Sequence, residues 1–136
     1  MDELIQMLHE EQLTCIVKQH DHVYKEFSNG IKPILHLLDD GHLEDAMLVD
    51  KVIGKAAALL MVKGKVATIH TCILSQHAKD VFDQYRIPYT YDQLVPYIIN
   101  RMKTGMCPME EAVLDIDDPA LAEKRLRQKV KAMQSA

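Results

Sequence analysis

The stretch that most constrains the fold is residues 46–60, AMLVDKVIGKAAALL, where a β-branched apolar run passes directly into a run rich in alanine and leucine. The first part predicts a strand buried on both faces, and the second predicts a buried helix. A strand that passes directly into a helix is the repeating unit of parallel α/β sheets. Ligands bind at such junctions because the first N–H groups of the helix are free and its dipole is positive there.

Asp50 and Lys51 stand at the predicted junction, where we expect an ion pair. Gly54 falls inside the predicted helix, where glycine costs about 1 kcal/mol relative to alanine, so something should pack closely on its backbone. Lys51 and Lys55 are four residues apart and would share one helix face, where both could meet an anion. The alternative is that Asp50 caps the helix and both lysines are solvated. The motif GxxxxGK[ST] of phosphate-binding loops is missing.

The rest of the chain predicts elements that alternate around this unit. We expect helices over 2–12 and 31–38, a hairpin of strands over 13–18 and 22–27, a strand over 65–74, and a helix over 76–85 with Ser75 as its N-cap. A short strand over 86–91 follows, and 92–100 fits a short helix or an irregular strand. Helices then start near Cys107 and at 117. This order predicts an α/β protein: a three-layer α/β/α sandwich with a mixed sheet.

Length and charge favour one soluble domain. The chain has 136 residues and a formal net charge of −4, which gives no support to a general polyanion-binding role. No apolar run approaches the roughly 18 residues that span a bilayer, and the acidic start differs from a signal peptide. Three separated cysteines without a CxxC motif suit a reduced cytoplasmic protein. We expect residues 1–116 to form the domain and 117–136 a helical appendage.

Two further candidate sites follow the apolar run 93–99. Asn100, Arg101 and Lys103 could bind a phosphate or carboxylate, although a loop arginine also ties down backbone carbonyls. Cys107 precedes a predicted helix, whose N-terminus lowers the pKa of a thiol and favours a nucleophile or redox centre. Against this, Glu110 stands one turn later, at the capping-box position, and would disfavour a thiolate. Cys72, at the end of a predicted strand, would line the same crevice.

Metal chemistry receives little support from the histidines. His42 and Glu44 spell the His-x-Glu of zinc deaminases, but they precede a strand where those enzymes open a helix, and no PCxxC follows. His70 and His77 could join Cys72, but their spacing matches no common site. We therefore expect no metal and no cofactor.

The last predicted helix is basic and amphipathic. Its cationic residues could suggest nucleic acid, but an apolar stripe of Leu126, Val130 and Met133 runs through them. A helix that packs on the domain or on a second copy explains this pattern better, so we expect no nucleic-acid partner and leave a homo-oligomer open. The cationic residues are Lys124, Arg125, Arg127, Lys129 and Lys131.

Four segments resemble the motifs of an uncharacterised prokaryotic family of unknown function, placed in the cytidine deaminase-like fold superfamily. They are GIKPILHLL (30–38), VDKVIGKAAALL (49–60), VPYIINR (95–101) and CPMEEAVL (107–114). The resemblance implies a three-layer sandwich with a site at the strand carboxyl ends. At the two helix openings that carry the zinc motifs in deaminases, this chain has Asp50-Lys51-Val52 and Ser75-Gln76-His77, so the resemblance carries over the fold and the pocket but no zinc chemistry.

The sequence leads to two functional hypotheses. The first is a zinc-independent ligand-binding domain or enzyme for a small anionic, nucleotide-like metabolite, and whether it is an enzyme stays open. In it, Lys51, Gly54, Lys55, Ser75, Asn100 and Arg101 bind the ligand, while Asp50, Cys72 and Cys107 are the candidate catalytic groups. The second is a non-enzymatic regulatory or interaction module with a vestigial deaminase-like pocket.

Overall fold

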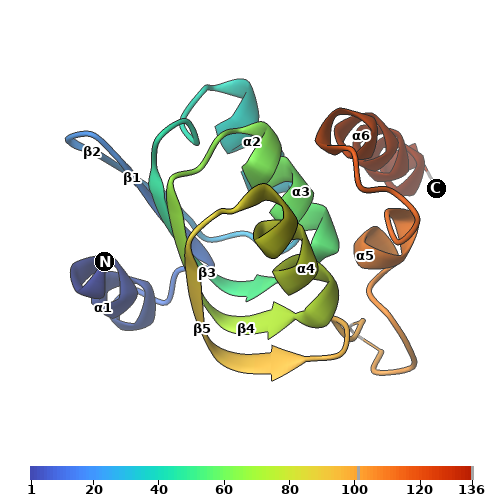
Figure 1. Ribbon diagram of the computed structural model, residues 1–136, viewed down its shortest axis with the longest axis horizontal. Helices are drawn as coiled ribbons and strands as arrows, with labels where there is room; N and C mark the ends of the chain where they lie inside the picture. The colour runs from blue at the N-terminus through green and yellow to red at the C-terminus, as the bar shows by residue number, and fades with distance from the viewer. Residues whose placement is uncertain (101, 136) are drawn as a thin grey trace.

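The computed structural model describes residues 1–100 and 102–135, and its centre is a mixed sheet of five strands in the order β2-β1-β3-β4-β5 (Figure 1). No helix in these ranges is both long and apolar enough to cross a membrane. The elements in chain order are α1 (Asp2–Glu10), β1 (Cys15–Gln19), β2 (His22–Glu26), α2 (Lys32–Asp39), β3 (Met47–Ile53), α3 (Lys55–Lys63), β4 (Thr68–Ser75), α4 (Gln76–Tyr85), β5 (Tyr89–Val95), α5 (Pro108–Ala112) and α6 (Pro119–Ser135).

The strand directions follow from the connections between the strands. β1 and β2 form the predicted hairpin, closed by His20 and Asp21, with His20 at a φ of 54°. β1 also pairs antiparallel with β3. The crossover helices α3 and α4 return the chain so that β3, β4 and β5 run parallel. The carboxyl ends of these three strands therefore lie at one edge of the sheet.

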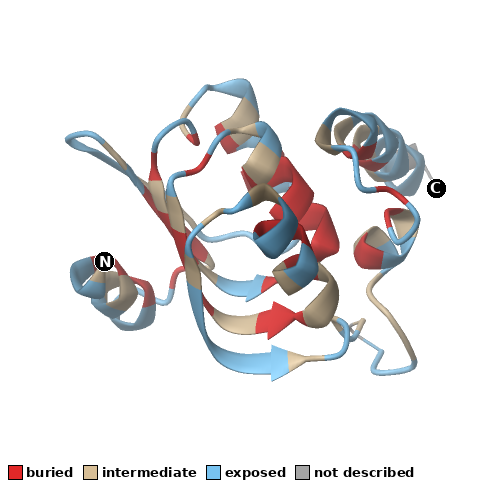
Figure 2. Ribbon diagram, in the orientation of Figure 1, coloured by how far each residue is buried: buried red, intermediate tan, exposed pale blue. Residues whose placement is uncertain are grey.

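Helices cover the two faces of the sheet unequally. On one face, Leu4 and Leu8 of α1 form a small core with Leu13, Ile16 and Val49. The other face carries the main core, to which α2, α3 and α4 contribute. Figure 2 shows α3 buried along most of its length, between the sheet and its neighbouring helices. The predicted α/β sandwich with a mixed sheet is confirmed, and so is the buried helix within 46–60. The strand is buried at Leu48, Val49 and Ile53, whereas Lys51 and Val52 are exposed.

Helix α6 packs on the side of α3 that faces away from the sheet (Figure 1). Ala122 and Leu126 are completely buried in the main core, and Val130 packs against it. The apolar stripe of the predicted amphipathic helix is therefore used within the chain. The division into a domain over 1–116 and an appendage over 117–136 stays a prediction.

Two predicted element boundaries are wrong. β3 continues to Ile53, because Val52 and Ile53 are β-branched and pair with β4, and the helix begins only at Lys55. The strand predicted over 86–91 instead runs as β5 from Tyr89 to Val95, because pairing with β4 holds its polar residues extended. In β3 the β-branched propensity and the pairing agree, whereas in β5 hydrogen bonding to β4 overrides the local propensity of the polar residues.

The packing of α6 makes a quantitative prediction. We expect Leu126→Ala to lower the free energy of unfolding by about 2–4 kcal/mol, because the substitution leaves a cavity in the main core. Leu121→Ala is the matched control, since Leu121 lies on the same helix and is 48% exposed. Urea unfolding of both variants checks this, and equal effects would contradict the placement of α6.

Candidate functional site

Helices α3 and α4 begin next to each other at the carboxyl edge of the sheet. β3 leads through Gly54 into α3, and β4 leads through Ser75 into α4. Because β3 and β4 are parallel neighbours, the two helix N-termini lie side by side. The Ser75 hydroxyl accepts a hydrogen bond from the N–H of Ala78 at 3.0 Å, which confirms Ser75 as the N-cap of α4.

The carboxylate of Glu110 lies between these two helix starts. Its Oε2 accepts the N–H of Lys55 and the hydroxyl of Ser75, each at 2.6 Å, and its Oε1 accepts the N–H of Ile98 at 2.7 Å. Glu110 is 1% exposed. The capping-box prediction is wrong, because Glu110 reaches away from its own helix and satisfies α3 instead. The chain thus supplies an anion at the junction where an anionic ligand was expected.

Gly54 allows this close approach. A Cβ at Gly54 would lie 2.8 Å from Oε2 of Glu110 and 2.9 Å from Cγ1 of Ile98. The expectation that something packs closely on this backbone is confirmed, but Gly54 is the extended N-cap of α3 and does not lie inside the helix. Lys51 lies in β3, so the predicted helix face shared by Lys51 and Lys55 is wrong as well.

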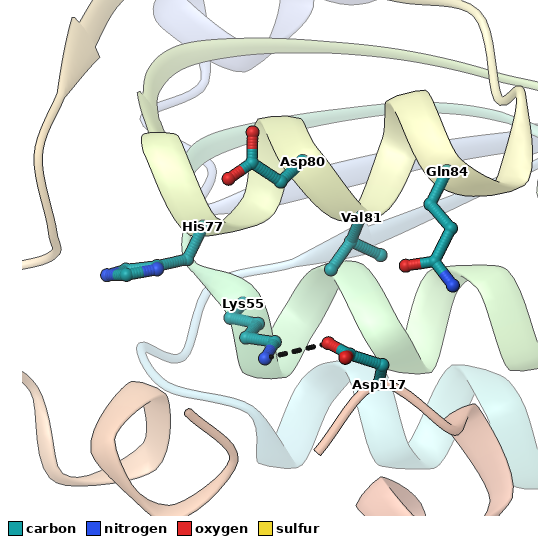
Figure 3. Close-up of a pocket in the computed structure, with 6 residues that line it drawn as sticks. All are labelled: Lys55, His77, Asp80, Val81, Gln84 and Asp117. Atoms are coloured by element: carbon teal, nitrogen blue, oxygen red, sulfur yellow. Dashed lines mark ion pairs between the residues drawn. The ribbon is translucent and has the colours of Figure 1, made fainter. Parts of the chain in front are cut away.

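Lys55 is buried and ties α3 to the segment that joins α5 and α6. Its Nζ donates to the carbonyl of Leu114 at 2.8 Å and lies 3.2 Å from Oδ1 of Asp117. Figure 3 shows Lys55 and Asp117 pointing toward each other beside His77 and Gln84 of α4. The cavity there measures about 100 Å³, well below the roughly 300 Å³ at which ligand pockets begin. This cavity is too small for a metabolite, and Lys55 acts as an internal cross-link.

A row of polar side chains crosses β3, β4 and β5 near their carboxyl ends. The register pairs Asp50 with Thr71 and Thr71 with Tyr91. The next residues along these strands therefore stand abreast, and we call them the polar row: Lys51, Cys72 and Asp92. Cys72 packs at the edge of the α1 core, so this row belongs to the face of the sheet that carries α1.

His70 lies beside the polar row on the same face. Its Nδ1 is 2.7 Å from the hydroxyl of Thr90, and its Nε2 is 3.6 Å from Oδ1 of Asp92. The imidazole is largely buried, whereas Asp92 and Lys51 are exposed. Charged and neutral polar groups from three strands therefore meet at one place.

Asp50 points to the opposite face from Lys51, because consecutive strand residues alternate. None of the ion pairs within residues 1–100 and 102–135 joins the two, so the predicted ion pair is wrong. Asp50 lies opposite Cys15 of β1, and burial of its carboxyl raises the pKa of Asp50 to about 7. A 3.4 Å hydrogen bond from the N–H of Val52 to Oδ1 works in the opposite direction.

Two of the three thiols are poor candidates for a thiolate. Burial raises the pKa of the Cys15 thiol well above its ordinary value, and Asp50 adds to this. Burial and the neighbouring Asp92 also raise the pKa of Cys72, although Lys51 acts against them. Cys107 is the N-cap of α5, which has only five residues, and its N–H donates to the carbonyl of Ile98 at 2.7 Å.

An apolar groove opens at the carboxyl ends of β3 and β4. Val52 of β3, Ile73 of β4 and residues 95–99 line it, and its volume is about 430 Å³. Val52 and Tyr97 are 40% and 38% exposed, and Ile99 is 58% exposed. We call this feature the strand-end groove. Its size falls within the range of cavities that hold small organic ligands, roughly 300–1,000 Å³.

Asn100 folds the segment that follows the groove. Its side chain donates to the Thr104 hydroxyl and accepts the N–H of Thr104, both at 3.1 Å. These bonds join Asn100 to Thr104, so the side-chain amide of Asn100 is already engaged within the chain. Arg101 lies outside the described residues. Binding of a ligand by either residue stays a prediction.

The residues considered for a metal are spread over separate parts of the fold. The His42 ring stacks on Tyr24 with 3.7 Å between ring centroids, in the turn before β3. His77 lines the small cavity of Figure 3, while His70 and Cys72 lie on the sheet face that carries α1. No group of three His, Cys, Asp or Glu residues within the described ranges is arranged to hold a metal ion.

Sequence reasoning missed the groove, the role of Glu110, and the approach of Asp92 to Cys72. Glu110 stands two residues after Pro108 and directly before Glu111, so its pattern predicts an ordinary helix start. The sequence left 92–100 open between a short helix and an irregular strand, because only pairing with β4 keeps Asp92 in β5. The apolar run over 95–99 was the sequence signal that could have indicated the groove.

Comparison with known proteins identifies the family. The family model TM1506, described as a domain of unknown function (DUF1893), matches residues 3–130. The chain belongs to the DUF1893 family.

A solved structure of this family is similar over nearly the whole chain. The crystal structure of a DUF1893 family protein (TM1506) from Thermotoga maritima at 2.70 Å resolution superposes with a TM-score of 0.85. The two sequences are 26% identical, and the match covers 96% of this chain and 88% of that one. No curated protein matches the chain. The chain was predicted to belong to a family of unknown function, and the match to DUF1893 confirms this prediction. Its membership of the cytidine deaminase-like superfamily stays a prediction.

The contacts of Glu110 predict a large effect for a small substitution. Glu110→Gln should lower the free energy of unfolding by about 2–4 kcal/mol, because the amide NH₂ must face at least one of the N–H or O–H donors. Glu111→Gln is the control, since Glu111 is exposed on the same turn. Chemical denaturation of both variants measures the difference, and a neutral Glu110→Gln would contradict the role of the carboxylate.

The raised pKa of Asp50 predicts how stability depends on pH. The folded-state pKa lies near 7 and the ordinary value is 3.8, so protonated Asp50 favours folding below pH 3.8 and this contribution is lost as the pH rises through 7. Asp50→Asn removes the titration. We therefore expect the free energy of unfolding of the variant, relative to that of the native protein, to rise by about 2–4 kcal/mol as the pH increases from about 4 to about 8. Urea midpoints at several pH values test this, and a pH-independent difference would reject the assignment.

Proposed function

We propose that this domain binds a small anionic metabolite in the strand-end groove. The observation that carries the proposal is the apolar groove at the carboxyl ends of β3 and β4, with Lys51 as an exposed cation directly before Val52 in β3. Apolar walls combined with a few polar groups are typical of ligand sites, and ligands of α/β proteins bind outside the carboxyl ends of the parallel strands.

The helix N-termini are a poorer place for the anion. The N–H of Lys55 and the hydroxyl of Ser75 already bind the carboxylate of Glu110, and Gly54 has no room for another group. An external anion would have to displace a buried, hydrogen-bonded carboxylate. Lys51 is exposed, and none of the ion pairs within residues 1–100 and 102–135 involves it, so the anionic end of the ligand is best placed beside it.

Asp50 is the group best suited to chemistry at this site. A carboxyl whose pKa is about 7 can both donate and accept a proton at neutral pH. Its Oδ1 accepts the N–H of Val52, which lines the groove. The raised pKa values of Cys15 and Cys72 favour the neutral thiols, so general acid–base catalysis by Asp50 is a better proposal here than nucleophilic attack by either of these two cysteines.

The proposed kinship with the cytidine deaminase-like superfamily is supported by the two helices that start side by side after parallel strands, α3 and α4. The alternative of an interaction module built on the terminal helix has less support. Helix α6 buries Ala122 and Leu126 in the main core, which leaves less of its apolar stripe for a partner.

The proposal predicts a ligand effect that depends on one lysine. A panel of anionic metabolites, nucleoside monophosphates included, should contain compounds that raise the melting temperature of the native protein. Lys51→Ala should weaken their binding about three- to ten-fold, as expected for loss of a partly exposed ion pair. The control is Lys18→Ala, because Lys18 is an exposed strand lysine opposite Met47, at the other end of β3. Equal affinities for both variants would reject the site.

A further inference from the structure

Resting on the function proposed above, we infer that the ligand of the strand-end groove is an amphipathic monoanion, an apolar body that carries one carboxylate-sized anionic group. The class is narrower than that of anionic metabolites in general, and it excludes phosphate-rich nucleotides. Three features of the site lead to it: the chemistry of the groove wall, the charges along the polar row, and the donors that Glu110 has already used.

The groove wall is almost entirely hydrocarbon. The side chains that line it come from Val52, Ile73, Val95 and residues 96–99, and the hydroxyl of Tyr97 is the polar group among them. Val52, Tyr97 and Ile99 leave more than a third of their surface in water. Covering such a surface gains roughly 25 cal/mol per Å² of apolar area, whereas a sugar or phosphate in the same place would lose its own hydration.

The charges beside the groove suit one negative group. Lys51 directly precedes Val52 in β3 and is exposed, so it supplies the positive charge closest to that wall residue along the strand. Asp92 stands on the same row two strands away. A ligand with one negative charge would pair with Lys51, but a second charge would meet the carboxylate of Asp92.

The donors that usually hold phosphates are already in use. The N–H of Lys55 at the start of α3 and the hydroxyl of Ser75 at the start of α4 both bind Glu110. The N–H of Ile98, in the wall of the groove, binds the same carboxylate. A phosphate in the groove would therefore lack the backbone donors that phosphate sites provide.

Matched probes of one shape test the inference. 4-Phenylbutanoate, 4-phenylbutanol and 4-phenylbutylamine share an apolar body and differ in charge, octanoate replaces the ring by a chain, and AMP represents the nucleotides. Binding to the full chain would be measured by amide chemical shifts, with residues 95–99 reporting on the groove. We expect the acid to bind about five-fold more tightly than the alcohol and the amine to bind more weakly than both.

Three variants assign the charge preference. Lys51→Ala should reduce the affinity for the acid to that for the alcohol, and Lys18→Ala should change neither. Val52→Asp places a carboxylate in the groove wall at a 40% exposed position that tolerates a polar group, and it should reverse the order so that the amine binds best.

The outcomes separate this inference from the proposed function. Equal binding of acid and alcohol, or tighter binding of the amine by the native protein, overturns the monoanion while the groove remains a binding site. Tighter binding of AMP than of both acids also overturns the class and leaves the proposed function standing. If no probe shifts residues 95–99, both are rejected. A preference for octanoate over 4-phenylbutanoate supports the class and identifies a chain as its body.

Discussion

The buried carboxylate of Glu110 is the interaction on which the arrangement of this molecule depends. It comes from α5, late in the chain, and it accepts hydrogen bonds from the start of α3, from the N-cap of α4 and from the backbone at Ile98. A carboxylate without these partners would be very costly to bury. With them, it joins the carboxyl edge of the sheet to the segment that positions α6, and the ion pair of Lys55 with Asp117 strengthens the same joint.

This joint also decides where chemistry can take place. Two helix N-termini side by side form a natural anion site, but here the anion belongs to the chain and the donors are satisfied. The accessible features lie further out: the strand-end groove, and the polar row of Lys51, Cys72 and Asp92, which lies one residue before Val52 and Ile73 along the strands. A ligand is therefore best placed on the strand ends, with Asp50 as the group whose protonation changes near neutral pH.

Periodicity in the sequence predicted most elements because their burial patterns are local. The hairpin around His20, the helix capped by Ser75 and the buried unit over 46–60 depend on neighbours in the chain. The errors arose where a distant strand decides the outcome. Pairing with β4 keeps Val52 and Ile53 in the strand and holds the polar residues of β5 extended. Because β3 extends to Ile53, Lys51 lies in the strand and does not share a helix face with Lys55.

The sequence by itself determined the α/β class, the order of elements and the edge of the sheet where a site belongs, because strand and helix periodicities and short connections are properties of neighbouring residues. It also indicated that something packs against Gly54. Only the tertiary structure decided that this neighbour is Glu110, 56 positions later in the chain, and that Lys55 is buried against Leu114 and Asp117. Hydrogen bonds between residues so far apart leave no periodic trace, since their partners are chosen by the packing of the whole chain.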